Sequence, residues 1–295
     1  MDVLPLGPGF AAELRGITLA DVAADDAVYD AVRAAFERHS VVVLRDQEVT
    51  DEAQIAFSRR FGPLEVTPAA TEGAGTNLVI LTTIGKDGKV VPADDRLALR
   101  NKANQLWHAD STFKSTPALA SVLSGRIMPA QGGETEYVST RLAWERLPPA
   151  TQKKVENLFA WHDYAHSRGK IAANIVGASE RAALPPQCWR MVWKNPANGR
   201  SALYIASHAY AIEGIEQGEA QKLLAELTEA ATTPALRFQH VWRKGDVVMW
   251  DNRATLHRGR PWPPHEARTM VRTTISARDV DGLQGVRPPA RQAAE

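Results

Sequence analysis

The stretch Arg268–Ala277, RTMVRTTISA, has the strongest β pattern in the chain. Its residues alternate between polar and apolar types and are rich in β-branched side chains, which predicts a strand. Arg268 and Arg272 are separated by an even number of positions, so both should lie on one face, about 13 Å apart at 3.3 Å per residue. Arginines that point into a core are costly unless each meets an anion. The alternative is an edge strand whose arginines face water.

Further strands and helices are predicted on both sides of this stretch. The predicted strands are 41–44, 78–84, 201–206, 237–242 and 247–250, and the predicted helices are 26–39, a helix capped by Thr50 that ends at 62–63, 141–147, 150–158 and 219–231. Two segments without clear periodicity, 90–104 and 166–190, are expected to be loops or lids. The polar tail 279–295 is expected to be disordered or packed only on the surface. This order favours an α+β fold on an antiparallel double sheet.

Composition excludes several classes of function. The 295 residues carry 35 Lys and Arg against 34 Asp and Glu, a formal net charge of +1. A near-neutral chain provides no general field for nucleic acid or for an acidic membrane, so we expect neither partner. A single cysteine, Cys188, allows no internal disulfide and no Cys-rich zinc site. The N-terminus does not resemble a signal peptide and no run approaches the roughly 20 apolar residues of a membrane helix. A cytoplasmic enzyme is therefore the expectation.

Two motifs predict a metal site. In Trp107-His108-Ala109-Asp110, the two polar side chains are two positions apart and can face one metal ion. His257 follows roughly 150 residues later, after Met249-Trp250-Asp251-Asn252-Arg253. Two histidines and one carboxylate form the facial triad of a non-heme iron(II) oxygenase, with three positions left open. The same three residues could also hold zinc and a bound water in a hydrolase.

These motifs resemble the taurine/2,4-dichlorophenoxyacetate dioxygenase family. The resemblance runs from about residue 10 to residue 279 and rests on four stretches: IAFSRRFGPL at 55–64, NQLWHADS at 104–111, GGETE at 132–136, and WDNR to HR at 250–258. It implies one dioxygenase domain over 1–295, with 279–295 as a tail. It also implies a double-stranded β-helix (jelly-roll) core with flanking helices. The cofactor and co-substrates that it implies are Fe(II), 2-oxoglutarate and O2.

The resemblance also implies residue roles. His108, Asp110 and His257 match the catalytic iron ligands, while Thr135 and Arg268 match the pair that holds the distal carboxylate of 2-oxoglutarate. Asn104 matches an amide near the co-substrate. Arg272 matches the arginine that meets the anionic group of the substrate, and His208 matches a histidine near the substrate in the phenoxyacetate branch.

The expected reaction is hydroxylation of an anionic small molecule. The residues around the first histidine and His208 are closer to the phenoxyacetate branch, so an aryloxyalkanoate is the leading substrate class. Its hydroxylation would give a phenol and a 2-oxo acid, with succinate and CO2. A taurine-like sulfonate dioxygenase that releases sulfite is the alternative, and a zinc hydrolase or a binding protein with an unused iron site are the rivals from other classes. The family resemblance also leads us to expect a homo-oligomer.

Overall fold

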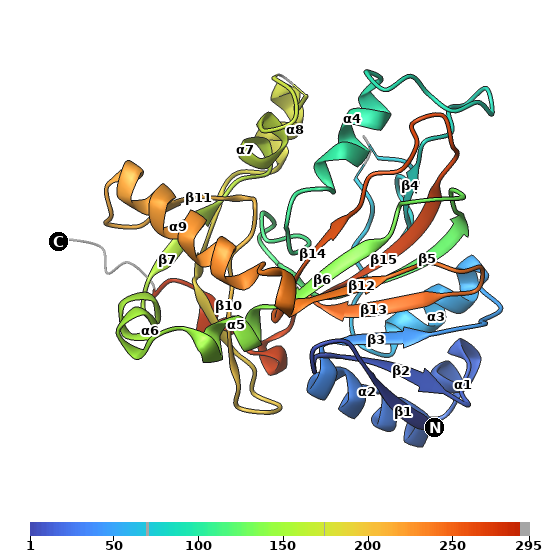
Figure 1. Ribbon diagram of the computed structural model, residues 1–295, viewed down its shortest axis with the longest axis horizontal. Helices are drawn as coiled ribbons and strands as arrows, with labels where there is room; N and C mark the ends of the chain where they lie inside the picture. The colour runs from blue at the N-terminus through green and yellow to red at the C-terminus, as the bar shows by residue number, and fades with distance from the viewer. Residues whose placement is uncertain (69–70, 174, 290–295) are drawn as a thin grey trace.

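The larger of the sheets has seven strands. The computed structural model describes residues 1–68, 71–173 and 175–289. The strand order in this sheet is β1-β2-β3-β13-β5-β15-β4 (Figure 1). The strands are β1 (Asp2–Leu6), β2 (Ala11–Arg15), β3 (Val41–Leu44), β13 (Val247–Asp251), β5 (Ala118–Ile127), β15 (Thr269–Ser276) and β4 (Val79–Thr82). All neighbours pair antiparallel except β2 and β3, which are parallel. Segments far apart in the chain therefore lie next to one another.

A three-stranded sheet of order β12-β6-β14 lies beside the large one. Its strands are β12 (Arg237–His240), β6 (Thr135–Ser139) and β14 (Thr255–Gly259), all antiparallel. The remaining strands form an antiparallel sheet β11-β7-β8 and the pair β10-β9. Their bounds are Ala209–Ile212 for β11, Phe159–His162 for β7, Gln187–Arg190 for β8, Ser201–Leu203 for β10 and Val192–Lys194 for β9. Together with the helices, these sheets give the expected α+β fold.

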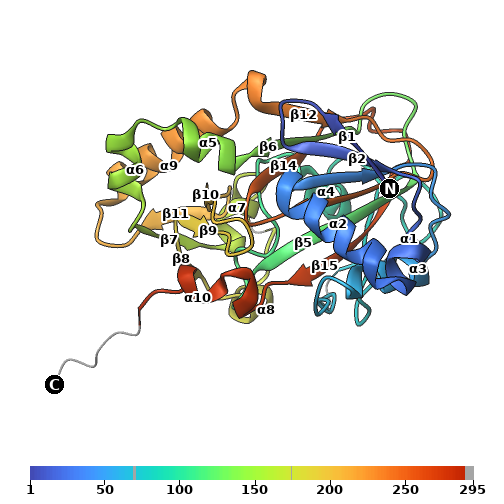
Figure 2. The same cartoon turned by 90° about the horizontal axis from the view of Figure 1, so that it is seen from below.

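Six of the helices lie at two ends of the molecule. Helices α1 (Leu19–Ala24), α2 (Asp26–His39) and α3 (Asp51–Arg59) gather at the N-terminal end, and α5 (Thr140–Arg146), α6 (Pro149–Val155) and α9 (Gln217–Ala231) lie at the opposite end (Figures 1 and 2). Within the described residues, no helix is both long and apolar enough to cross a membrane.

Local signals explain the helices that the sequence predicted well. The side chain of Asp25 accepts from the backbone N–H groups of Ala27 and Val28 at the start of α2, and Ser40 ends that helix in the left-handed region. Thr50 caps α3 through the N–H of Ala53, as predicted. Three Phe side chains of these helices and the following turn are completely buried and pack in one core, namely Phe36, Phe57 and Phe61.

Strand β15 is an interior strand, so the edge-strand alternative is wrong. It pairs with β5 on one side and with β4 on the other. One face carries Val271 and Thr273, which lie against α3, where Ser58 Oγ lies 2.6 Å from Thr273 Oγ1. The opposite face carries Met270, Arg272 and Thr274. Arg268 directly precedes the strand and is 8 % exposed. The two arginines therefore do point into the protein, where they need anionic partners.

Both predicted loops contain short helices instead. The segment 90–104 includes α4 (Arg96–Ala103), and the segment 166–190 includes most of α7 (Tyr164–Gly169), α8 (Ala178–Ala183) and strand β8. Helix α4 begins at Asp95, whose side chain accepts from the N–H of Leu97. These helices have six to eight residues each, too short to show a clear apolar period.

The tail prediction is also wrong for the part that the structure describes. Residues Asp279–Asp281 form a 3₁₀ turn, and Leu283–Val286 form α10. Leu283 and Val286 are buried in the main core, and Asp281 is 1 % exposed. The last six residues of the predicted tail, 290–295, lie outside the described residues.

A buried ion network ties the β13–β14 turn to the N- and C-terminal segments. Arg253 Nε lies 2.9 Å from Asp251 Oδ1, and Arg253 Nη2 lies 2.9 Å from Glu37 Oε2 on α2. Arg253 Nη1 also donates to the carbonyl of Asp281 at 3.2 Å. Burial would lower the pKa of Arg253, but the carboxylates of Asp251 and Glu37 outweigh it and raise that pKa. The turn that precedes His257 is therefore held in place by contacts of Arg253 with Asp251, with Glu37 and with the carbonyl of Asp281.

The buried imidazole of His162 on β7 should make the free energy of unfolding depend on pH. The side chain is completely buried, neither ring nitrogen has a hydrogen-bond partner among the described residues, and burial lowers its pKa to about 3. An unfolded histidine has a pKa near 6.5, so the unfolded chain binds more protons below that pH and stability falls as pH falls. We expect His162 alone to reduce the free energy of unfolding by about 2 kcal/mol between pH 8 and pH 5.

Urea denaturation of the metal-free protein at both pH values tests this expectation. His162→Gln should show a pH-dependent loss smaller than that of the wild type by the same amount, because the other buried histidines are common to both proteins. An identical pH dependence in the two proteins would contradict a neutral, buried His162.

Candidate metal centre and active site

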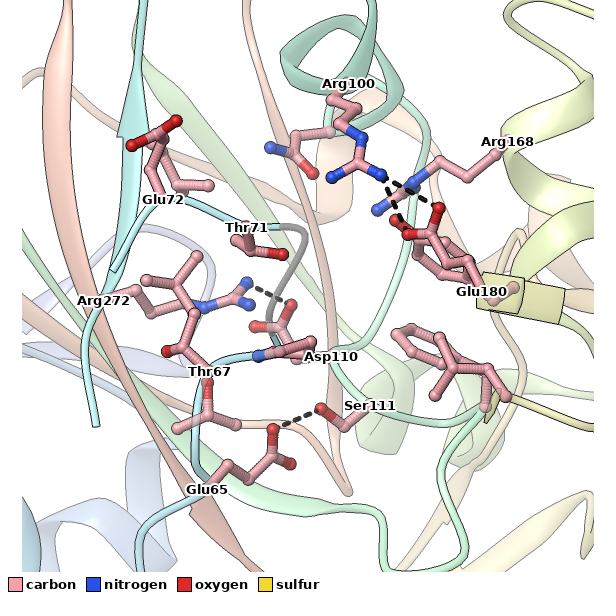
Figure 3. Close-up of a pocket in the computed structure, with 18 of the residues that line it drawn as sticks. Glu65, Thr67, Thr71, Glu72, Arg100, Asp110, Ser111, Arg168, Glu180 and Arg272 are labelled. Carbon is pink, nitrogen blue, oxygen red and sulfur yellow. Dashed lines mark hydrogen bonds and ion pairs between the residues drawn. The ribbon is translucent and has the colours of Figure 1, made fainter. Parts of the chain in front are cut away.

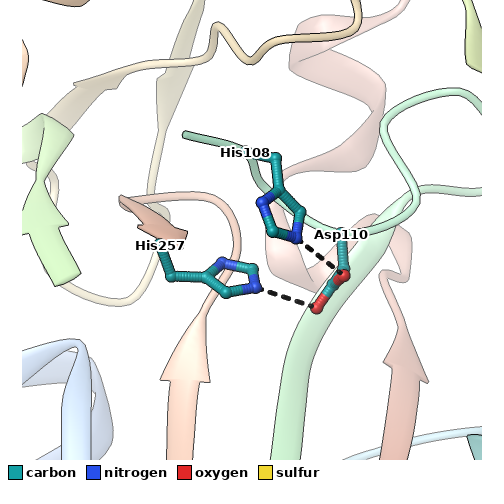
Figure 4. A group of neighbouring side chains, drawn as sticks. All are labelled: His108, Asp110 and His257. Atoms are coloured by element: carbon teal, nitrogen blue, oxygen red, sulfur yellow. Dashed lines mark ion pairs between the residues drawn. The ribbon is translucent and has the colours of Figure 1, made fainter. Parts of the chain in front are cut away.

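Three predicted ligands meet between the two main sheets. His108 and His257 pair as an antiparallel β-bridge, with N–H to carbonyl distances of 3.0 and 2.8 Å. Asp110 follows two positions after His108, so its side chain returns to the same side. One ligand atom from each of the three residues lies within 4.8 Å of the other two (Figure 4). Asp110 carboxylate oxygens lie 3.9 Å from His108 Nε2 and 3.7 Å from His257 Nε2.

Neighbouring groups fix the orientation of these side chains. His108 Nδ1 lies 2.7 Å from the carbonyl of Leu106, which places a proton on Nδ1 and leaves Nε2 free as a ligand. Ser121 Oγ donates to Asp110 Oδ2 at 2.7 Å. Asn252 Oδ1 accepts from the backbone N–H of Asp110 at 2.9 Å, so the turn after β13 supports the centre directly.

The charge states suit metal binding. Burial lowers the pKa of both His108 and His257, so both imidazoles are neutral at pH 7. Burial would raise the pKa of Asp110, but the Arg272 guanidinium, together with the hydrogen bond from Ser121, lowers it below its ordinary value. Arg272 Nη1 lies 2.5 Å from Asp110 Oδ1. A carboxylate and two neutral imidazoles are the protonation states that ligation requires.

Arg268 provides a buried positive charge near Thr135. Its Nη2 donates to the carbonyl of Gly133 at 3.1 Å, two residues before Thr135, while its Nε has no hydrogen-bond partner among the described residues. Burial lowers the pKa of Arg268 to about 10, so it remains charged at pH 7. A Cβ at Gly133 would lie 3.1 Å from Arg268 Nε, and the φ of +71° there favours glycine. A buried guanidinium with unused donors is a site for an anion.

A large cavity opens beside the three ligands. Its volume is about 720 Å³, and its wall includes His108, Asp110 and Arg272 (Figure 3). The wall is built from β4, α4, α7 and α8, together with the segment that follows α3. Arg100 of α4 forms an ion pair with Glu180 of α8, in which its Nη2 donates to both carboxylate oxygens at 3.0 and 2.9 Å. The two segments predicted as lids therefore do border the site, and they are joined to each other.

Comparison with known proteins identifies the family. Residues 2–274 match the family described as "Taurine catabolism dioxygenase TauD, TfdA family". The chain belongs to the TauD/TfdA family. Among curated members of that family, it is 38% identical over 275 residues to the alpha-ketoglutarate-dependent 2,4-dichlorophenoxyacetate dioxygenase of Cupriavidus pinatubonensis, covering 92% of this chain and 96% of that protein.

Two further TauD/TfdA relatives support the same placement. The (S)-phenoxypropionate/alpha-ketoglutarate-dioxygenase of Sphingobium herbicidovorans is 34% identical over 283 residues, covering 93% of this chain and 94% of that protein. A crystal structure of AAD-2 in complex with Mn(II) and N-oxalylglycine superposes with a TM-score of 0.88 at 32% identity. The match covers 99% of this chain and all of that one. In both comparisons, the match with this chain covers nearly the full length of the relative.

The other residues that the TauD/TfdA resemblance implies lie around the same centre. Asn104, at the end of α4, lines the cavity, and its carbonyl accepts from the N–H of Gly259 at 2.9 Å. His208 also lines the cavity, and its side chain is completely buried. Its ring centroid lies 6.3 Å from that of His108, and its Nδ1 lies 3.2 Å from Thr112 Oγ1. Five of the eight predicted site residues therefore line the cavity, namely Asn104, His108, Asp110, His208 and Arg272. His257 completes the ligand cluster, and Arg268 bonds to the carbonyl of Gly133, two residues before Thr135.

Sequence reasoning missed the charged residues of the cavity wall. Glu65, Arg100, Lys114, Arg168 and Glu180 all line it. They lie in short helices or irregular segments, and nothing in their spacing predicted that they would meet. The only available signal was the lid expectation for the two segments that contain Arg100, Arg168 and Glu180.

Trp242 is a positioning residue for Thr135. Its Nε1 donates to Thr135 Oγ1 at 3.0 Å, so the single hydroxyl proton of Thr135 is directed away from the indole. The family resemblance implies that Thr135 holds 2-oxoglutarate, and on that role we expect Trp242→Phe to weaken 2-oxoglutarate binding about 5-fold, because one hydrogen bond contributes about 1 kcal/mol. Anaerobic titration of the Fe(II) protein with 2-oxoglutarate, followed by visible absorption, measures this.

The control for that titration is Trp144→Phe, which replaces a tryptophan of α5 in a different core cluster. It should bind 2-oxoglutarate as the wild type does. Unchanged affinity in Trp242→Phe would show that the indole does not orient Thr135.

Proposed function

We propose that this protein is an Fe(II)- and 2-oxoglutarate-dependent dioxygenase that hydroxylates an aryloxyalkanoate. The observation that carries this proposal is the cluster of His108, Asp110 and His257, whose ligand atoms lie within 4.8 Å of one another. The same chain also has a buried arginine, Arg268, whose Nε has no hydrogen-bond partner among the described residues. Membership of the TauD/TfdA family supports the class of reaction. The phenoxyacetate and phenoxypropionate dioxygenases among its relatives support the class of substrate.

The donor set fits iron(II). Two neutral imidazoles and one carboxylate on one side of a site are the ligands of non-heme iron oxygenases, and they leave the other positions for co-substrates. His108, Asp110 and His257 would hold the metal. Arg272 and Ser121 both contact the Asp110 carboxylate, so the orientation of that ligand is set before the metal arrives.

The pocket of Arg268 fits the distal carboxylate of 2-oxoglutarate. Its unpaired Nε needs an acceptor, and a carboxylate matches the geometry of a guanidinium. The hydroxyl of Thr135 adds a third donor, and we propose that the Asn104 amide lies near the same co-substrate. A hydrolase that uses zinc on the same three ligands would have no need for this second anion site.

When bound, iron(II) with 2-oxoglutarate and O2 supplies oxidative hydroxylation of a C–H bond, with succinate and CO2 as products. The residues of this chain bind and orient the reactants and keep bulk water away. We propose that Arg272 and His208 lie on the substrate side, as the family resemblance implies. Hydroxylation of the carbon beside an ether oxygen gives a hemiacetal, which breaks down to a phenol and a 2-oxo acid.

We further propose that the core is a double-stranded β-helix within one domain over residues 1–295. The seven-stranded sheet and the β12-β6-β14 sheet would be its two layers, because the ligands come from both sides of the gap between them. Two related proposals are a homo-oligomer and a cytoplasmic location without nucleic-acid or membrane partners. Light scattering after size-exclusion chromatography tests the oligomer.

Succinate formation from 2-oxoglutarate, with iron(II), ascorbate and O2, tests the proposed function. The candidate substrates are phenoxyacetates, both enantiomers of 2-phenoxypropionate, taurine and several alkyl sulfonates. We expect stimulation by an aryloxyalkanoate, with phenol released in equal amount. Stimulation by a sulfonate with sulfite release would replace the substrate class and retain the site residues. No stimulation by any aryloxyalkanoate would reject the proposal.

A further inference from the structure

The charged side chains inside the cavity are mostly paired with one another. The ion pairs there are Lys114 with Glu65 at 2.5 Å, Arg272 with Asp110 at 2.5 Å, and Arg100 with Glu180 at 2.9 Å. Arg96 shares Glu180 at 3.5 Å. Arg168 is the cation of the wall that has no carboxylate within 4 Å among the residues the structure describes.

The residues around Arg168 place its guanidinium at the surface of the cavity. The residue belongs to α7, and its guanidinium lies 4.7 Å from the ring centroid of Tyr164. Its Nε is buried without a hydrogen-bond partner among the described residues. Figure 3 shows the side chain extending from α7 into the cavity. A guanidinium stacked on an aromatic ring keeps its outer N–H donors available for a planar anion.

A continuous row of rings links this charge to the metal centre. The Tyr164 ring lies 4.8 Å from that of Phe113, and Phe113 lies 4.8 Å from His208. His208 is in turn 6.3 Å from the ligand His108. Arg168 therefore borders the part of the cavity into which a substrate must extend to bring a C–H bond to the metal.

Arg272 and His208, the two other residues proposed on the substrate side, cannot fully neutralise the anionic group of a substrate. Arg272 is already engaged by Asp110. His208 is completely buried, and its Nδ1 lies 3.2 Å from Thr112 Oγ1, so only its Nε2 is left to meet an anion. An anionic substrate that enters the cavity needs a cation that is still available.

We propose that Arg168 binds the carboxylate of the substrate, as a second cation in addition to Arg272. This role rests on the proposed function. It restricts the substrates to aryl acids with a planar anion that can accept two parallel hydrogen bonds, and it disfavours neutral ethers and amides of the same shape.

The test compares an acid with its neutral isostere. Titration calorimetry would measure 2,4-dichlorophenoxyacetate and 2,4-dichlorophenoxyacetamide binding to the anaerobic protein loaded with Mn(II) and 2-oxoglutarate. We expect Arg168→Gln to weaken acid binding about 30-fold and amide binding less than 2-fold, because a hydrogen bond to a charged group is the one removed. The affinity for 2-oxoglutarate should stay within 2-fold of the wild type.

Arg60→Gln is the matched control. Its guanidinium also lies 4.7 Å from a tyrosine ring, that of Tyr29, but outside the cavity. Arg60→Gln should leave the affinities for 2,4-dichlorophenoxyacetate and 2,4-dichlorophenoxyacetamide unchanged.

Two results would overturn the role of Arg168. These are an unchanged affinity for the acid in Arg168→Gln, or an equal loss for acid and amide, which would indicate that the side chain acts through packing. Arg168→Lys separates charge from geometry and should recover part of the acid affinity. If wild-type protein forms no phenol from any aryloxyalkanoate, the proposed function itself fails, and this role of Arg168 fails with it.

Discussion

Asp110→Asn is expected to lower kcat/KM for succinate formation by at least about 1,000-fold, or about 4 kcal/mol. The amide keeps the shape of the carboxylate and can still accept from Ser121, but it carries no charge to hold a divalent metal. It also leaves Arg272 without its anionic partner. Metal affinity, measured by titration with Mn(II), should fall in parallel with activity. The helical circular dichroism spectrum should not change.

Asp95→Asn is the matched control for this variant. Asp95 lines the same cavity, and its side chain caps α4 through the N–H of Leu97, a role that asparagine fills equally well. Activity in this control should stay within 2-fold of the wild type. Activity of Asp110→Asn within 10-fold of the wild type would reject Asp110 as a ligand. Lost activity with unchanged metal affinity would assign Asp110 a role other than ligation.

Arg253→Met should reduce the free energy of unfolding by about 3–5 kcal/mol. The change leaves two carboxylates, those of Asp251 and Glu37, buried without their main counter-charge. It also removes the donor to the Asp281 carbonyl, which anchors the C-terminal turn. Guanidinium denaturation followed by tryptophan fluorescence measures the loss.

An exposed pair provides the comparison for Arg253. Arg200 lies 2.6 Å from Glu145 with both side chains about 40% exposed, so Arg200→Met should cost less than about 1 kcal/mol. Adding Glu37→Gln to Arg253→Met should recover part of the lost stability, because it removes one of the two carboxylates that have lost the Arg253 counter-charge. Equal effects of Arg253→Met and Arg200→Met would show that the buried network contributes nothing to stability.

The elements that the sequence predicted well have local causes. Helix α2 has its cap, its amphipathic period and its left-handed end between Asp25 and Ser40, and β3 is a short aliphatic run that directly follows. Short helices such as α4 and α8 lack the full set of these signals, and α8 has no capping side chain. Asp95 caps α4, and the Arg100–Glu180 ion pair links α4 to α8, so a contact between distant segments contributes to their conformation.

The candidate site was predictable only in part, because it also depends on contacts between segments that are far apart in the sequence. The residue types and the even spacing of Arg268 and Arg272 indicated inward charges. The two motifs suggested a shared metal site for His108 and His257, and the resemblance to a known family made that prediction specific for iron(II). The structure adds their backbone pairing, which no local pattern encodes. Arg168 remained unnoticed because its significance depends on which neighbouring cations are already paired.

The β-bridge between His108 and His257 has a consequence for folding kinetics. It closes a loop of roughly 150 residues, so this contact raises the contact order of the fold and carries a large entropic cost. The metal site is therefore complete only after the seven-stranded sheet and the β12-β6-β14 sheet have packed together, which we expect to be a late step of folding. A bound metal would then slow unfolding and leave the refolding rate almost unchanged. Its protection would therefore be kinetic, acting on the lifetime of the native state.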